Sequence, residues 1–103
     1  MLRLMRWIPA ALACGIALPS AAADTVTDGR RLAATCAACH GTDGATQGKA
    51  LPPLAGQPQA ALAASLAAYK AGTREATIMQ QIARGYTDEQ LAAIAAYFAA
   101  QPK

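Results

Sequence analysis

The chain has 103 residues and a formal net charge of +3, with 54% hydrophobic residues but only 5% aromatic ones. This length fits a single small domain. Because the sequence contains neither a basic run nor interleaved aromatic residues, the charge gives no indication of nucleic-acid binding. The histidine is the only one in the chain, and it directly follows a pair of closely spaced cysteines.

The first 23 residues have the order of regions typical of a secretory signal peptide. Arg3 and Arg6 form a short positive segment, residues 7–18 are apolar, and residues 21–23 supply an A-x-A cleavage site. About a dozen apolar residues are too few to span a bilayer unaided. We therefore expect residues 1–23 to be removed during export to the periplasm.

Cleavage there would leave a mature domain over residues 24–103, with no membrane span. Without Arg3 and Arg6 it keeps seven basic and six acidic residues, so most of the basic balance belongs to the signal segment. Two alternatives stay open: Cys14 could be acylated as a lipid anchor, or the N-terminal segment could be retained as an anchor.

The first helix of the mature domain is predicted from about Val26 to Cys39, and it leads into the motif Cys-Ala-Ala-Cys-His at residues 36–40. C-x-x-C-H is the attachment motif of a c-type haem. Two thiols that lie three residues apart on a helical turn share one face and can meet one edge of a porphyrin. We therefore expect Cys36 and Cys39 to hold one covalent haem c, with His40 as a ligand of its iron.

Two other kinds of site also use a C-x-x-C pair. A dithiol oxidoreductase motif requires a β-α-β context, and the sequence has no convincing strand. A structural zinc site requires four ligands, whereas Cys36, Cys39 and His40 supply three. Both readings are therefore less favoured than haem attachment.

The rest of the chain predicts an all-α fold with about four helices around one haem. The glycine and proline content of residues 41–57 excludes a regular element there. Further helices are expected at residues 58–72, at residues 75–84 and from residue 87 onward. Thr87 and Gln90 have the spacing of a capping box at the start of the last helix. Because alanine buries little area, whereas a haem contributes about 10 kcal/mol of gross apolar burial, we predict that the haem-free chain is largely unfolded.

The second axial ligand is predicted to be Met79, the only methionine of residues 24–103. A lone methionine usually fills a gap in the core. Beside a haem with one histidine the ligand reading is favoured, because His/Met pairing is a standard cytochrome c arrangement. Lys49 and Lys70 are alternatives only in principle, since an amine must first lose its proton. An open sixth position would indicate gas binding or peroxidase chemistry, for which the sequence offers no distal histidine.

The mature chain resembles the small bacterial class I cytochromes c. The resemblance rests on residues 29–32 and 36–44, on the loop at residues 52–57 and on residues 69–74. It implies the all-α fold of that family and a one-electron carrier. In the family a loop proline carbonyl accepts a hydrogen bond from the haem histidine, and Pro52 matches that proline by position.

Residues 78–90 resemble more narrowly the cytochrome subunit of flavocytochrome c sulfide dehydrogenase. In that enzyme a subunit containing FAD oxidises sulfide and passes electrons singly to the haem subunit. The resemblance implies a flavoprotein partner and an electron-accepting role, without sulfide chemistry in this chain. Many related carriers have Leu-Ser where this chain has Tyr86-Thr87. The alternative is a free diffusible class I cytochrome c that shuttles electrons between respiratory complexes and other redox proteins.

Overall fold

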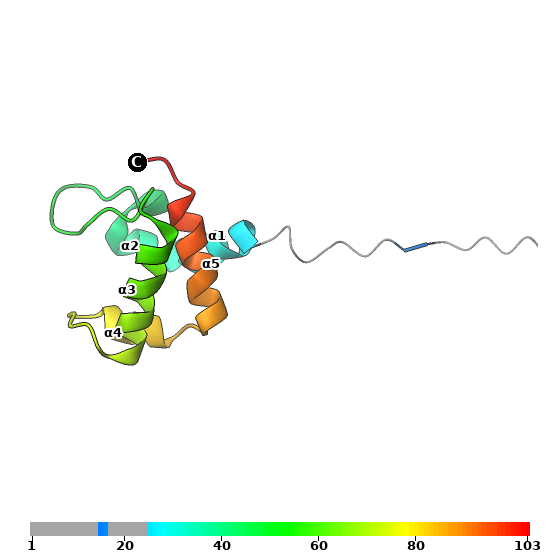
Figure 1. Cartoon of the computed structure of the whole chain (residues 1–103). Coiled ribbons are helices and arrows are strands. Elements are labelled where there is room, and N and C mark those ends of the chain that lie inside the picture. The colour runs from blue at the N-terminus through cyan, green and yellow to red at the C-terminus, as the bar shows by residue number, and fades with distance from the viewer. Residues whose placement is uncertain (1–14, 17–24) are drawn as a thin grey trace, which may run out of the picture.

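The computed structural model describes residues 15–16 and 25–103. The predicted signal peptide, including Cys14, lies outside the described residues apart from residues 15–16. Signal cleavage and acylation therefore stay predictions. All regular elements among the described residues are helical, as expected for the all-α class, and Figure 1 shows their arrangement. In chain order they are α1 (Thr25–Ala33), η2 (Ala34–Cys36), α2 (Ala37–His40), η3 (Thr42–Gly44), α3 (Gln59–Ala71), α4 (Met79–Arg84) and α5 (Asp88–Ala99).

The helix predicted from Val26 to Cys39 is divided into three pieces. An α-helix gives way to the 3-10 turn η2, and the short helix α2 follows and ends at His40. Gly41 then has φ 81 and ψ 167, a backbone conformation that residues with a Cβ rarely adopt. A Cβ at Gly41 would also lie 2.3 Å from the carbonyl oxygen of Ala45. The chain therefore turns away sharply right after the histidine.

The next two helices differ slightly from their predicted bounds. Pro58 is the residue before α3 rather than its first residue, and Gly72 ends that helix in the left-handed conformation, with φ 77. Helix α4 begins at Met79, four residues later than the predicted Glu75. Ile78, with φ −135, lies outside the helix. This β-branched residue and the preceding threonine disfavour helical backbone, so the segment before Met79 stays extended or bent.

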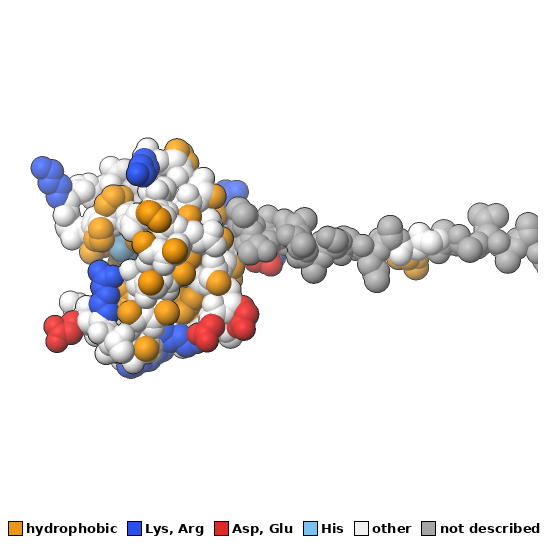
Figure 2. Space-filling view, viewed as in Figure 1, with side chains coloured by type: hydrophobic (Ala, Val, Ile, Leu, Met, Phe, Trp, Pro, Cys, Tyr) orange, Lys and Arg blue, Asp and Glu red, His pale blue; other side chains and the backbone are white. Residues whose placement is uncertain are grey.

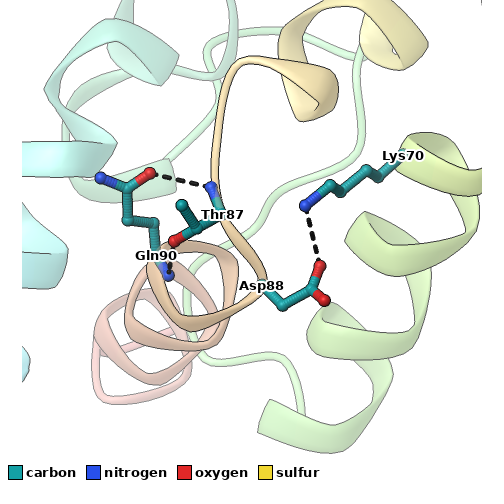
Figure 3. A network of polar contacts seen from close by, with 4 residues as sticks. All are labelled: Lys70, Thr87, Asp88 and Gln90. Atoms are coloured by element: carbon teal, nitrogen blue, oxygen red, sulfur yellow. Dashed lines mark hydrogen bonds and ion pairs between the residues drawn. The ribbon is translucent and has the colours of Figure 1, made fainter.

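The start of α5 has the predicted capping box, drawn in Figure 3. The Thr87 hydroxyl accepts a hydrogen bond from the Gln90 N–H at 3.1 Å, and the Gln90 side-chain oxygen accepts one from the Thr87 N–H at 2.9 Å. Nearby, Lys70 Nζ in the last turn of α3 lies 2.9 Å from Asp88 Oδ1. Such an exposed ion pair contributes under about 1 kcal/mol, so it adds little to the stability of the fold.

The core forms where α5 packs on α1 and on α3. The buried cluster is drawn mostly from α5 and consists of Ala33, Leu62, Leu91, Ile94, Ala95, Tyr97 and Phe98. Helices α1 and α5 approach closely at Gly29, where an added Cβ would lie 2.2 Å from the Ala93 carbonyl oxygen. Within the part of the chain that the structure describes, no helix has the length and apolarity needed to cross a bilayer.

Candidate haem-binding site

The two cysteines of the motif lie on adjacent short helical turns. Cys36 closes η2 and packs against the core cluster, whereas Cys39 lies in α2 and is exposed. Both thiols are free. Burial raises the pKa of the Cys36 thiol, and the proximity of Cys39 adds to this rise while hydrogen bonds from Thr35 and the backbone oppose it. The pair therefore presents two unbridged sulfurs at the boundary between core and surface.

His40 ends α2 and is partly buried. Its ring nitrogen Nδ1 is buried and has no hydrogen-bond partner among the described residues. A buried polar atom without a partner costs about 1–3 kcal/mol, so proteins seldom keep one without a reason. An imidazole whose other nitrogen binds a metal normally donates this remaining N–H to an acceptor nearby.

The loop after His40 is held to it by Thr46, which the sequence analysis missed. The Thr46 hydroxyl lies 3.1 Å from the carbonyl oxygen of His40 and 3.2 Å from that of Pro52. The Thr46 hydroxyl thus bridges the backbone carbonyl groups of His40 and Pro52. The Pro52 carbonyl is bonded to Thr46 and not to the ring, so the expected bond from Nδ1 to Pro52 stays a prediction. The only sequence signal for Thr46 is a hydroxyl in a loop, where such side chains often bond the backbone.

Met79 is the first residue of α4 and is partly buried. Helix α4 packs on α3. In Figure 1, α2 and α4 appear toward opposite ends of α3, so His40 and Met79 belong to separate parts of the fold. Two apolar side chains near Met79 are open to solvent: Ile78, which precedes it, is 54% exposed, and Ile82, in the same helix, is 36% exposed. Figure 2 shows hydrophobic side chains gathered over this view of the molecule.

These observations test whether the residues present fit a haem. Among the described residues, half of the ten buried hydrophobic side chains are alanines, so the protein-only core is thin. Apolar side chains at Leu51, Ile78 and Ile82 remain uncovered, and two free thiols stand beside a histidine with an unpaired buried nitrogen. A large apolar ring attached through both sulfurs would cover apolar surface and use the histidine as a ligand. The donor set therefore fits a covalent haem.

Comparison with known proteins points the same way. The cytochrome c family model matches residues 26–101. The chain is 44% identical over 70 residues to cytochrome c-554(548) of Halomonas halodenitrificans, which covers 65% of this chain and 84% of that protein. It is 37% identical over 82 residues to the cytochrome subunit of sulfide dehydrogenase of Chlorobaculum tepidum, which covers 80% of this chain and 74% of that subunit.

Among solved structures, the chain is similar to thiosulfate dehydrogenase from Marichromatium purpuratum in its as-isolated form. The TM-score is 0.71 at 37% identity, over 75% of this chain but only 19% of that one. The likeness therefore concerns one domain of a larger protein. Fold, motif and family agree with one another, and they confirm the predicted fold class and cofactor. The chain belongs to the cytochrome c family, as a class I electron-transfer protein with a covalently bound haem c.

Proposed function

We propose that this cytochrome is the electron-accepting subunit of a sulfide-oxidising flavocytochrome c, exported to the periplasm after loss of residues 1–23. One observation carries the proposal. The similarity to the sulfide dehydrogenase cytochrome subunit extends over most of both chains, at 80% of this one and 74% of the other. The flavoprotein partner would carry out the sulfide chemistry, and this chain would pass the electrons on.

In this proposal Cys36 and Cys39 hold the haem, while His40 and Met79 ligate its iron. When bound, the haem supplies a one-electron iron couple whose potential depends on the axial ligands. The position of His40 directly after Cys39, partly buried and with Nδ1 withdrawn from solvent, supports its assignment. Lys70, a possible rival to Met79, is engaged in an ion pair at the start of α5. An amine must also lose its proton before it can bind the iron, so a thioether is favoured as the second ligand.

The protein part of the mechanism is to hold two ligands from separate parts of the fold at fixed positions. On the histidine side, Gly41 and Thr46 fix the backbone directly after His40. On the methionine side, Met79 begins a helix that packs on α3. A one-electron reaction is fast when the ligands do not rearrange with the charge on the iron. Rigid placement of both side chains is therefore what this chain contributes.

A lasting complex with a flavoprotein also requires an apolar docking surface, because permanent hetero-complexes bury large and rather apolar areas. Ile78 and Ile82 leave apolar surface open beside Met79. Because a haem held between His40 and Met79 would cover part of this same surface, the interface with the flavoprotein would use the part that stays open around the haem.

A free diffusible carrier is the second candidate. The observation in its favour is the 44% identity to cytochrome c-554(548), which is matched over 84% of its length. A carrier of this kind would use a small interface, and its association with partners would weaken as salt screens the charges.

Gentle purification of the native protein from periplasm separates the two candidates. The absorbance of its fraction is scanned for flavin alongside haem, and sulfide is then added, with thiosulfate as the comparison substrate. A flavin polypeptide in fixed ratio to the haem, with haem reduced by sulfide, is the expected result. A haem protein that travels alone at low salt and stays oxidised with sulfide contradicts the subunit proposal and favours the carrier.

A pair of surface variants sharpens this test. Ile78→Gln places a polar side chain on the apolar surface beside Met79, and Ala92→Gln makes a similar change at an exposed position of α5. We expect the ratio of flavin to haem in the purified fraction to fall for Ile78→Gln alone. An equal ratio in both variants shows that the flavoprotein does not dock at Ile78.

A further inference from the structure

Tyr86 joins two segments that are far apart in the sequence. It lies in the turn between α4 and α5, is partly buried, and packs against the core cluster. Its hydroxyl donates a hydrogen bond to the carbonyl oxygen of Leu32 at 3.2 Å and lies 2.8 Å from the hydroxyl of Thr35. Because the tyrosine proton goes to Leu32, the Thr35 hydroxyl is the donor in the second bond. One phenol oxygen thus holds two positions at the end of α1 and in η2.

The place where Tyr86 binds is the point at which the first helix changes its hydrogen-bond pattern. Helix α1 ends at Ala33 and the 3-10 turn η2 follows. Carbonyl groups in the last turn of an α-helix lack their usual intrahelical donors, and they take other donors where these are available. Tyr86 supplies such a donor to Leu32. It thereby fixes the turn whose last residue is Cys36.

The backbone of Tyr86 is fixed at its other end to the helix that carries Met79. The Tyr86 N–H donates to the carbonyl oxygen of Ala83 in the last turn of α4, at 3.2 Å. Thr87, the next residue, is the capping residue of α5. Tyr86 therefore cannot shift by itself, because its main chain belongs to the junction of these two helices.

We propose that Tyr86 is a positioning residue for the axial ligands. Its hydroxyl ties the turn that ends at Cys36, directly before the short helix that ends at His40, to the segment that begins with Met79, and this tie keeps Met79 bound to the iron. The inference rests on the ligand assignment proposed above. Removal of one such partly exposed hydrogen bond changes an equilibrium by about three- to tenfold. The equilibrium affected here is the exchange of Met79 for an external ligand.

The test uses the haem-loaded full chain and the variant Tyr86→Phe, which keeps the ring and removes only the hydroxyl. Imidazole is titrated into the oxidised protein, and loss of the weak far-red iron–sulfur band reports displacement of Met79. We expect the affinity for imidazole to rise about three- to tenfold. The control is Tyr97→Phe, which also removes one tyrosine hydroxyl. The Tyr97 hydroxyl donates a hydrogen bond to Asp43, three residues after His40, and this bond does not involve α4. The imidazole affinity of Tyr97→Phe should therefore stay within about twofold of the wild-type value.

A second variant tests the route through Thr35. If Tyr86 acts partly through that hydroxyl, the effects of Thr35→Val and Tyr86→Phe are not additive. The fold increase in imidazole affinity of the double variant is then smaller than the product of the two single increases. An unchanged affinity in Tyr86→Phe, or an equal rise in Tyr97→Phe, would each overturn the proposal, whereas additive effects would show that the tie runs through the Leu32 carbonyl alone. The equal rise in Tyr97→Phe would indicate general loosening of the fold.

Failure of the ligand assignment gives a different result. A wild-type protein without the far-red band, or a Met79→Ala variant with the wild-type spectrum, shows that Met79 is not a ligand. A normal band in the wild type combined with an unchanged imidazole affinity in Tyr86→Phe refutes the role of Tyr86 alone.

Discussion

Replacement of Gly29 by alanine tests how closely the first and last helices pack. Gly29 lies in α1 and faces α5, where an added Cβ would be 2.2 Å from the carbonyl oxygen of Ala93 and 2.9 Å from the Cβ of Tyr97. Both contacts are with atoms at or near the backbone, so no side-chain rotation relieves them. The methyl group requires the two helices to move apart by about 1 Å before ordinary contact distances are restored.

The expected cost follows from two opposed effects. Alanine is better than glycine in a helix by about 1 kcal/mol, which favours the variant. Overpacking of a tight contact costs about 1–3 kcal/mol, and separation of the helices by about 1 Å also forfeits a quarter to a half of each dispersion contact across them. Because rigid backbone atoms put the steric cost at the upper end, we expect a net loss of about 2 kcal/mol in the free energy of unfolding.

For a domain of about 80 residues this loss lowers the melting temperature by about 10 °C. The assay is thermal unfolding of haem-loaded protein followed by circular dichroism, with haem content checked by absorbance. Gly85→Ala is the matched control, since its nearest contact would be 3.3 Å from the Ile82 carbonyl oxygen, and its effect should stay under about 1 kcal/mol. A Gly29→Ala variant as stable as the wild type, or more stable, would refute the close crossing and show that helix propensity dominates.

Three further predictions concern the ligands, the cofactor and pH. Met79→Ala should lower the reduction potential and open the iron to cyanide or carbon monoxide, and an unchanged potential with unchanged ligand exclusion contradicts the axial assignment. The double variant Cys36→Ser, Cys39→Ser should be haem-free and largely unfolded, so a cooperative thermal transition in it would speak against a cofactor-dependent core. Burial, together with a hydrogen bond to Asp43, raises the pKa of Tyr97. The folded state therefore keeps the phenol proton when the unfolded chain loses it near pH 10, and stability should fall as the pH rises from about 10 through the folded pKa. Tyr97→Phe should therefore lose less unfolding free energy than the wild type between pH values on either side of about pH 10, as measured by urea unfolding. An equal loss in the variant and the wild type refutes the assignment.

Local sequence patterns predicted the parts of the molecule that depend on a few neighbouring residues. The C-x-x-C-H motif indicated the cofactor, and the family shows it. The spacing of Thr87 and Gln90 predicted the capping box that the structure contains. The break of the first helix at residues 34–36 was missed, because Ala-Thr-Cys contains neither glycine nor proline and gives no local stop signal. The start of α4 was also predicted too early, at Glu75 instead of Met79, since helix boundaries read from local patterns are uncertain by a few residues.

The contacts that place the ligands were harder to predict from the sequence on one side of the site than on the other. His40 is held by residues close to it in the chain, because Gly41 follows it directly and Thr46 bonds its carbonyl from six positions away. On the Met79 side, the proposed positioning residue is Tyr86, whose hydroxyl contacts residues 51 and 54 positions away in the sequence. Long-range contacts of this kind form only after the intervening chain has been ordered, and they are lost when helices separate.

This asymmetry has a consequence for function. The histidine side is built into a short motif and its loop, so it is defined as soon as that segment is formed. The proposed methionine side would require α1, α4 and α5 to be assembled around Tyr86, so binding of Met79 to the iron would report on the state of the whole fold. A protein that passes single electrons needs both ligands fixed while the charge on the iron changes. With Met79 as the proposed second ligand, we therefore expect the tertiary packing around the junction of α4 and α5, rather than the attachment motif, to decide whether the cytochrome keeps that ligand and its potential.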